Sequence, residues 1–237
     1  MARLPGGARA RLAALSAMDQ TRVAVHPWPA ARQMIDAAGK ARLIVISVAT
    51  PLDTLRDAAR AKIRTAVREV LGLQLARAPE TITLFPMPGQ AMRVDLPGQR
   101  IGLSASHELG ISVAAIHHCG PVGVDIMRPP QALEWQPVAR DYLGPHTFNR
   151  IASLALHEQL PAFAREWTCL EACLKCTGVG LQEWHPWIAN RTGAFRVAEL
   201  ELPAGLFGAI ALTPAAGFPS MCHFCASTCQ CSSFASP

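Results

Sequence analysis

The sequence predicts an α+β fold in which a strand–helix–strands group precedes a helices–strands group. Runs rich in β-branched residues, such as 42–49, are bounded by glycine or proline, which is typical of strands. Two long stretches, 52–71 and 161–177, repeat apolar residues at helical spacing. This order is compatible with a repeated α+β unit, although the two halves share no obvious sequence repeat.

The composition is that of a folded globular protein. The chain has 237 residues, of which 50% are hydrophobic and 16% charged, enough for a real core in one large domain or two small ones. The net charge of +5 favours an acidic partner or a phosphate-bearing ligand over nucleic acid, for which denser basic clusters are expected. No apolar run approaches the roughly 18 residues of a membrane helix, so no membrane association is expected.

The two ends of the chain differ from the middle. Residues 1–20 are basic and rich in small residues, and arginines interrupt them too often for a secretory signal, so we expect a disordered extension. Translation from Met18 explains this segment equally well. Residues 214–237 show no periodic pattern of apolar residues and are expected to be a disordered tail, with a zinc site as the weaker alternative. The cysteines of this tail are Cys222, Cys225, Cys229 and Cys231.

Three further cysteines lie on one face of the expected helix 161–177. Cys169, Cys173 and Cys176 follow an i, i+4, i+7 spacing, and we interpret them as small buried residues rather than as a zinc or redox site. The chain has no pattern of a secreted disulfide framework, so we expect a cytoplasmic protein.

The first half is expected to hold one strand and one helix before a set of antiparallel strands. Strand 42–49 ends before Pro51, and helix 52–71 is expected to stop at Gly72. A second stripe on this helix is basic and consists of Arg56, Arg60, Arg64 and Arg68. Spacing alone favours a solvated flank, and a basic ridge that holds a phosphate is the alternative.

The centre of the chain is expected to be a run of antiparallel strands. A short strand at 81–85 leads into a turn-rich hairpin at 86–98, and further strands cover 101–108, 111–116 and 122–126.

The second half is expected to be helical before it returns to strands. Helices are expected over 131–143 and 147–156, and a long one over 161–177, with Pro161 near N1 and Gly178 at C′. The final strands are expected at 195–202 and 206–212.

Two carboxylates and a lysine are the main candidates for chemistry. Asp125 lies in an apolar strand, where a lone carboxylate is costly unless it is paired or binds a metal, and a helix cap or a buried salt bridge is the alternative. Glu171 and Lys175 are four residues apart, a spacing usually explained by a surface ion pair, but their helix is otherwise nearly apolar and favours a buried polar site. Two acids and a lysine suit a divalent cation and a phosphate.

Ser106 and His107 are adjacent on an expected strand. Because neighbouring strand residues point to opposite faces, a Ser–His nucleophile pair is disfavoured, and His107 as a donor to a phosphate is the better interpretation. The other histidines, including His117 and His118, are interpreted as surface residues.

Three motifs occur in an order that resembles a known family. SASH at 104–107 is followed by GPVGVDIM at 120–127 and EWTCLEACLK at 166–175. This pattern is similar to that of the 4′-phosphopantetheinyl transferases of the surfactin-synthetase type, and the resemblance covers residues 42–212. It implies two similar α+β halves, related by a pseudo-twofold axis, with the active site in the cleft between them.

The resemblance also implies a reaction. The 4′-phosphopantetheine arm of coenzyme A would be transferred to a serine of an apo carrier protein, giving holo carrier protein and 3′,5′-ADP. By position, Asp125 and Glu171 would bind Mg²⁺, Glu171 would accept the serine proton directly or through water, and Lys175 would stabilise the phosphate charge. The residues expected to hold coenzyme A are Arg60 and Arg64 at its 3′-phosphate and Ser106, His107 and Lys175 at its other phosphates.

The same resemblance sets expectations for domains and partners. The halves are expected at 21–120 and 121–213, and the second would carry the metal site. The acceptor would be an acyl, peptidyl or aryl carrier protein of fatty acid or secondary metabolite biosynthesis, and two fused halves are expected to act as a monomer. Neither nucleic acid nor a membrane is an expected partner.

Two positions depart from the family pattern. Met127 stands where many members have Glu, so a water or a backbone oxygen would have to complete the metal shell. Leu170 stands where many members have Lys. These departures motivate the alternative of a coenzyme A or carrier-protein binding relative with little or no turnover. A metal-dependent phosphodiesterase is a third, weaker hypothesis.

Overall fold

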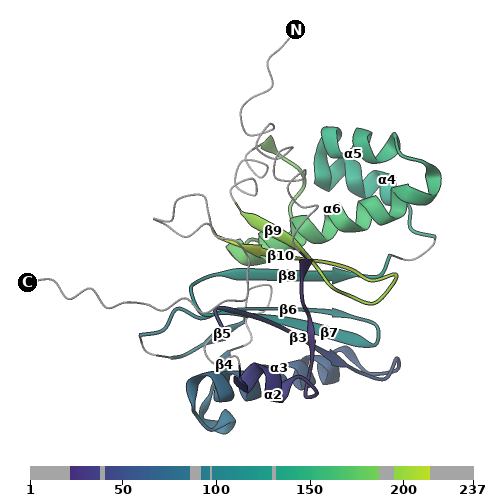
Figure 1. Cartoon of the computed structure of the whole chain (residues 1–237). Helices are drawn as coiled ribbons and strands as arrows, with labels where there is room; N and C mark the ends of the chain where they lie inside the picture. The colour runs from purple at the N-terminus through teal and green to yellow at the C-terminus, as the bar shows by residue number, and fades with distance from the viewer. Residues whose placement is uncertain are drawn as a thin grey trace, which may run out of the picture.

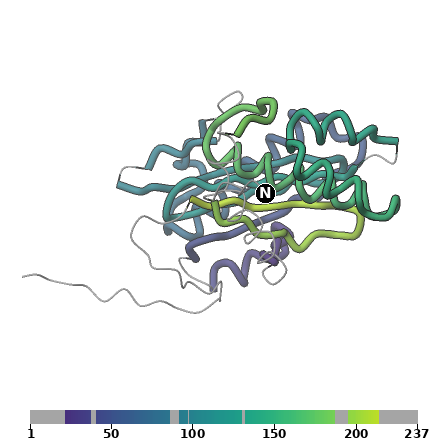
Figure 2. Tube along the Cα trace, turned by 90° about the horizontal axis from the view of Figure 1, so that it is seen from above, coloured from purple at the N-terminus to yellow at the C-terminus, as the bar shows by residue number. Residues whose placement is uncertain are grey.

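The structure is a computed structural model that describes residues 22–37, 41–85, 92–96, 98–129, 132–186 and 195–213. The expected extension at 1–20 and the cysteine-rich tail at 214–237 lie outside the described residues. The prediction of an α+β fold is confirmed: two four-stranded sheets lie at the centre, and helices cover their outer faces (Figure 1). Seen from above, the strands of both sheets run along the long dimension of the molecule (Figure 2).

The first sheet is built from the N-terminal half of the chain. Its strands, in the order β2-β3-β7-β6, are β2 (His26–Pro27), β3 (Leu43–Ala49), β7 (Ile111–His117) and β6 (Gly102–Glu108). Strands β6 and β7 form the predicted antiparallel hairpin, whose turn is Leu109 and Gly110. Gly110 has a φ of 82°, which only glycine adopts at little cost. This register places Ser112 opposite His107.

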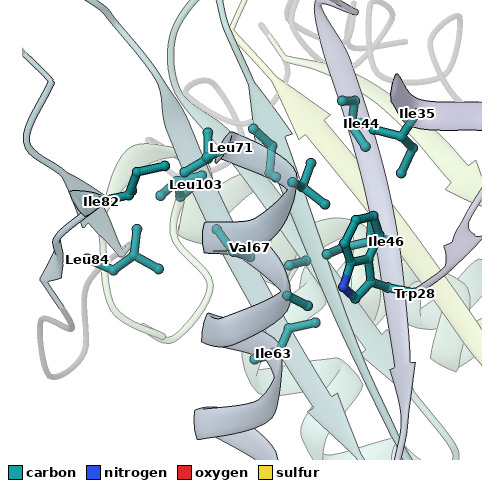
Figure 3. Packing of buried hydrophobic residues seen from close by; sticks show 14 residues of the cluster. Trp28, Ile35, Ile44, Ile46, Ile63, Val67, Leu71, Ile82, Leu84 and Leu103 are labelled. Carbon is teal, nitrogen blue, oxygen red and sulfur yellow. The ribbon is translucent and has the colours of Figure 1, made fainter. Parts of the chain in front are cut away.

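Helix α3 (Arg56–Leu75) covers the outer face of this sheet beside the short helix α2 (Arg32–Ala37). Figure 3 shows branched side chains of α3 packed into a single cluster with those of the strands and of Trp28. Its fully buried members include Ile46, Ile63, Val67, Leu71 and Ile116. Burial of a branched side chain contributes about 1.5–3 kcal/mol, so this cluster stabilises the first half.

The bounds predicted for this helix were wrong at both ends. It begins at Arg56 rather than at residue 52, and Leu55 is an exposed N-cap residue. Gly72 lies inside the helix instead of ending it. A glycine is needed here for another reason, because a Cβ would come within 2.8 Å of the carbonyl oxygen of Arg77. The helix ends at Leu75, and its C-cap residue Ala76 has a left-handed φ of 51°.

A short ribbon follows this helix. A 3₁₀ turn at Pro79–Thr81 precedes β4 (Leu84–Phe85), which pairs antiparallel with β5 (Arg93–Val94). The predicted strand at 81–85 is therefore shorter than expected, because its first residue belongs to the turn. The expected hairpin is confirmed by the pairing, although 86–91 lie outside the described residues.

The second sheet has the order β1-β9-β10-β8, with β1 (Arg22–Val23), β9 (Arg196–Leu200), β10 (Phe207–Leu212) and β8 (Val122–Met127). Strand β8 pairs antiparallel with β10, and β9 pairs parallel with β1. The prediction that β8 continues the central antiparallel run was therefore wrong, since β8 begins the second sheet. The two final strands are confirmed, with bounds slightly inside those predicted.

The helices of the second half lie on the outer face of the second sheet (Figure 1). They are α4 (Trp135–Val138), which continues into a π-helical turn at Ala139–Leu143, α5 (Gly144–Ala152) and α6 (Leu156–Thr177). The expected helices at 131–143 and 147–156 are thus present with shifted bounds. None of the described helices is long and apolar enough to cross a membrane.

Helix α6 begins earlier than predicted. Its first residue is Leu156, and the carboxylate of Glu158 accepts the backbone N–H of Ala155 at 3.3 Å, which caps the first turn. Pro161 therefore lies inside the helix rather than near N1. Its C-terminus is as predicted, because Gly178 takes the left-handed φ of 70° at the cap.

The inner faces of the two sheets meet in a second core. Val45 and Val113 of the first sheet pack with Val124 and Ile210 of the second. The molecule thus has four layers: helices, sheet, sheet and helices (Figure 1). The two sheets also lie edge to edge where β6 approaches β8, and this junction positions the candidate site.

Candidate active site

Helix α6 approaches β8 closely because both carry small residues there. A Cβ at Gly123 would overlap the carbonyl oxygen of Ala172, so only glycine permits this spacing. Small side chains line the rest of the contact: Ala172, Cys173, Cys176, Ala209 and Ala211. The prediction that the helical cysteines are buried is confirmed for Cys173 and Cys176. Burial raises the pKa of the Cys176 thiol to about 11, which keeps it protonated and unreactive.

This close approach lets Lys175 reach across to β8. Its Nζ lies 2.6 Å from Oδ1 of Asp125 and donates to the carbonyl oxygen of Val124 at 3.2 Å. Asp125 is buried, with 7% of its surface exposed. The salt bridge of Lys175 is therefore with Asp125, 50 residues away, and satisfies the buried carboxylate that the sequence analysis singled out.

Two serines of β6 join the edges of the two sheets. Ser104 Oγ accepts the backbone N–H of Val124 at 3.0 Å, and Ser106 Oγ accepts that of Ile126 at 3.2 Å. Ser106 Oγ also donates to Asp125 Oδ1 at 2.8 Å. The predicted cofactor residue Ser106 thus contacts the predicted metal ligand directly.

Glu171 is half-buried on α6, four residues before Lys175. Burial raises the pKa of its carboxyl, the charge of Asp125 raises it further, and Lys175 partly offsets both effects. A half-buried carboxyl whose pKa is raised by the charge of a neighbouring carboxylate makes a place for a cation. Among the described residues no group of three or more His, Cys, Asp or Glu side chains could hold a metal ion. Asp125 and Glu171 still fit Mg²⁺, which takes one or two carboxylates and fills its shell with waters and phosphate oxygens.

His107 lies on the opposite side of β6 from the two serines. Leu103 and Ala105 pack toward α3, and strand alternation puts His107 on that same face. Its Nδ1 lies 2.8 Å from Ser112 Oγ. Burial lowers the pKa of His107 to about 4, so the ring is neutral at pH 7. Positive charges add to this effect, in decreasing order from Arg60, Arg56, Lys175 and Arg64.

The arginines of the basic stripe on α3 differ in their contacts. The positive charges of Arg60 and Arg64 help to lower the pKa of His107, so both act on the surroundings of this ring. Arg68 has another role, because its Nε donates to the carbonyl oxygen of Ile82 at 3.2 Å. Arg60 also forms an exposed pair with Asp57 at 3.3 Å, which a phosphate could replace at little cost.

Ser106, Asp125 and Lys175 therefore contact one another at the β6–β8 junction, whereas His107 lies on the face of β6 that is turned toward α3. Sequence reasoning missed Ser112, Gly123 and the contribution of Arg56. Ser112 could have been found from the two-residue turn of the hairpin, which sets it opposite His107. Leu170 is buried in the apolar core of α4–α6, where the half-buried Met127 also packs, so neither departure leaves a polar group unpaired.

A surface cavity of about 410 Å³ lies beside α6, and its lining does not include Asp125, Glu171 or Lys175. It is bordered by Arg165, Glu199 and Phe207, among others. The guanidinium of Arg165 pairs with Glu199 at 3.5 Å and lies 5.2 Å from the centre of the Phe207 ring. These charges are already satisfied, so we place the candidate chemistry at Asp125 and Glu171 instead.

Comparison with known proteins points to one family. Residues 121–207 match the model of the 4′-phosphopantetheinyl transferase superfamily. The curated 4′-phosphopantetheinyl transferase HetI of Nostoc sp. (strain PCC 7120) is 32% identical over 78 residues. That alignment spans about a third of each protein, 32% of this chain and 32% of HetI. The matched segment of the chain includes Asp125, Glu171 and Lys175, whereas His107 and the arginines of α3 precede this segment.

Proposed function

Because residues 121–207 match the model of the 4′-phosphopantetheinyl transferase superfamily, we propose that the chain transfers the 4′-phosphopantetheine group of coenzyme A to a serine of an apo carrier protein. The observation that carries the proposal is the contact of Lys175 with Asp125 beside Glu171, while a neutral histidine and the arginines of α3 lie on the other face of β6. This arrangement combines a place for a cation with a basic surface for phosphates. It is what transfer of a phosphoryl group requires of a protein.

The proposed reaction exchanges one phosphorus–oxygen bond for another. The serine oxygen of the carrier attacks the phosphorus that bears the pantetheine arm, and the bond to the 3′,5′-ADP leaving group breaks. Glu171 takes the serine proton, directly or through water, and its raised pKa makes it a better acceptor than an ordinary glutamate. Lys175 offsets negative charge on the phosphates. Mg²⁺, held by Asp125 and Glu171, would neutralise charge on the pyrophosphate.

Coenzyme A would be bound by side chains of the first half. In the tautomer in which Ser112 donates to Nδ1 of His107, Nε2 of the ring carries a proton and could donate to a phosphate oxygen. Arg60, followed by Arg64, is proposed to bind the 3′-phosphate, because both lie close enough to act on His107. The active site would then lie between the halves 21–120 and 121–213.

The remaining parts of the proposal concern the setting of the reaction. We propose a surfactin-synthetase type enzyme that works as a monomer in the cytoplasm on acyl, peptidyl or aryl carrier proteins. Its net charge of +5 would speed encounter with an acidic carrier protein.

The test is a loading assay. The protein is incubated with coenzyme A, Mg²⁺ and several apo carrier proteins, and mass spectrometry follows the gain of one phosphopantetheine group. We expect loading by the wild type, none with Glu171→Gln, and normal loading with Glu183→Gln, which changes an exposed carboxylate outside the site. Coenzyme A binding without any gain of mass would instead establish the binding relative with little turnover. Loading by the Glu171→Gln variant at the wild-type rate would refute the role of Glu171.

A further inference from the structure

Ser106 has contacts that do not suit a residue that binds coenzyme A. It is buried, with 6% of its surface exposed. Its Oγ donates to Asp125 Oδ1 at 2.8 Å and accepts the N–H of Ile126 at 3.2 Å. A hydroxyl has only one hydrogen to donate, and here that hydrogen is already used. Ser106 could therefore donate to a phosphate oxygen only by releasing Asp125.

We infer that Ser106 is a positioning residue for Asp125, which it holds in the orientation needed to bind the cation. Both hydrogen bonds that reach the carboxylate from described side chains end on Oδ1, one from Ser106 and one from Lys175. Among the described residues no side chain donates to Oδ2, which is therefore available to a cation. Because the donors come from β6 and α6, they restrain the carboxylate from both halves of the molecule.

The two donors are not equivalent. Lys175 has a long, flexible side chain and is itself proposed to move its charge onto the phosphates of the substrate. Ser106 has a short side chain, whose oxygen is also anchored to the backbone of Ile126. When Lys175 turns to a phosphate, Ser106 remains as the group that fixes Asp125. Groups that orient a metal ligand in this way typically account for 10- to 100-fold in metal affinity.

Ser104 provides a matched control for this role. It lies two residues earlier on β6, is also buried, and accepts a backbone N–H of β8 at 3.0 Å. Its hydroxyl has no contact with Asp125 among the hydrogen bonds of the described residues. Replacement of Ser104 therefore removes the same type of link between the sheets and leaves the carboxylate in place.

The inference rests on the proposed function, since it takes Asp125 as a cation ligand, and its test uses a readout other than loading. Electron paramagnetic resonance measures the Kd of Mn²⁺ for the full chain with saturating coenzyme A. We expect Ser106→Ala to raise this Kd about 10- to 100-fold and Ser104→Ala to change it less than about twofold. Coenzyme A affinity, measured in excess chelator, should be the same for wild type and Ser106→Ala.

A second pair of variants covers the case in which the alanine variant folds poorly. Ser106→Thr keeps the hydroxyl and Ser106→Val replaces it by a methyl group of nearly the same size. We expect the threonine variant to bind Mn²⁺ more tightly than the valine variant. Equal Mn²⁺ affinities in this pair would overturn the inference, as would an alanine variant that loses coenzyme A affinity in chelator. If the wild type itself fails to bind Mn²⁺, the proposed metal role falls, and the inference falls with it.

Discussion

Helices α3 and α6 each cover the outer face of one sheet, but they meet that sheet through different kinds of residue. The contact of α3 consists of large branched side chains, including Ile46, Ile63, Val67, Leu71 and Ile116. The contact of α6 consists of small ones, including Gly123, Ala172, Cys176, Ala209 and Ala211. The first contact buries much apolar surface, whereas the second brings two backbones close together.

This difference places the residues proposed for chemistry on one helix and the main apolar anchoring contacts on the other. A close backbone approach lets Lys175 of α6 reach Asp125 of β8 and keeps Glu171 near the same carboxylate. Large side chains on α6 would hold these groups apart. Helix α3 instead presents its arginines at the edge of a well-packed core, where they can act on a ligand without taking part in the packing.

The largest effect is expected where the close approach is removed. Gly123→Ala would drive a methyl group into the carbonyl oxygen of Ala172 and push α6 from β8. Overpacking of this kind costs about 1–3 kcal/mol or more, and a misplaced catalytic group loses about 100-fold in rate. Denaturant unfolding and the loading assay measure both. Gly180→Ala is the control, because nothing lies within 4 Å of its added Cβ. Wild-type loading by Gly123→Ala would show that the close approach is not needed.

The opposite pattern is expected in the core of α3. Ile63→Ala leaves a cavity in the cluster of Figure 3 and should destabilise the protein by about 2–5 kcal/mol. Loading per folded molecule should be unchanged, because Ile63 does not contact the site. Leu55→Ala, at a position 78% exposed, should change stability by less than about 0.5 kcal/mol. A large loss of loading by folded Ile63→Ala would erase the distinction between the two helices.

A smaller effect should separate two arginines of the same stripe. Arg60→Ala is expected to weaken coenzyme A binding about 10-fold, since a hydrogen bond to a charged group is lost. Arg68→Ala should leave that affinity nearly unchanged, because Arg68 donates to the carbonyl oxygen of Ile82. Isothermal titration calorimetry at two salt concentrations measures both affinities. Equal losses in the two variants would mean that the stripe acts only through its overall charge.

The smallest effect concerns pH. The pKa of His107 is about 4 in the folded protein and near 6.5 in the unfolded chain, so the unfolded chain binds more protons between these values. Stability should therefore be unaffected above pH 6.5 and fall as the pH is lowered from 6.5 toward 4. Solvent screening reduces the size of this change, since the ring is only partly buried. The difference in melting temperature between wild type and His107→Asn should become smaller as the pH is lowered toward 4. A difference that does not change with pH would contradict the lowered pKa of His107.

Much of the fold could be predicted because local signals and tertiary packing agree. The strand runs and the long helices were recognised from their periods, and Gly178 marked the end of α6. Gly72 misled because a glycine that looks like a helix stop can also serve a close contact with Arg77. The start of α6 was missed because Pro161 resembles a first-turn proline, whereas Glu158 caps the helix a full turn earlier.

The sequence singled out the residues of the candidate site but did not indicate how they pair. The spacing of Glu171 and Lys175 suggests that they pair with each other, yet the salt bridge of Lys175 is with Asp125. The partner of Lys175 depends on how closely α6 approaches β8, which is a property of tertiary packing. Ser106 was expected to contact a phosphate, whereas in the structure its hydroxyl donates to Asp125. The position of β8 relative to β6 decides its partner, and no local pattern encodes it.

The junction of β6 and β8 also has a consequence for hydrogen exchange. The N–H groups of Val124 and Ile126 are held by serine hydroxyls, whereas their neighbours on β8 face β10 across a regular antiparallel ladder. Rotation of one side chain frees such an amide without separating two strands, so its protection measures local opening rather than global unfolding. These two amides would therefore exchange faster than those that alternate with them, and report on how firmly the two sheets are held together.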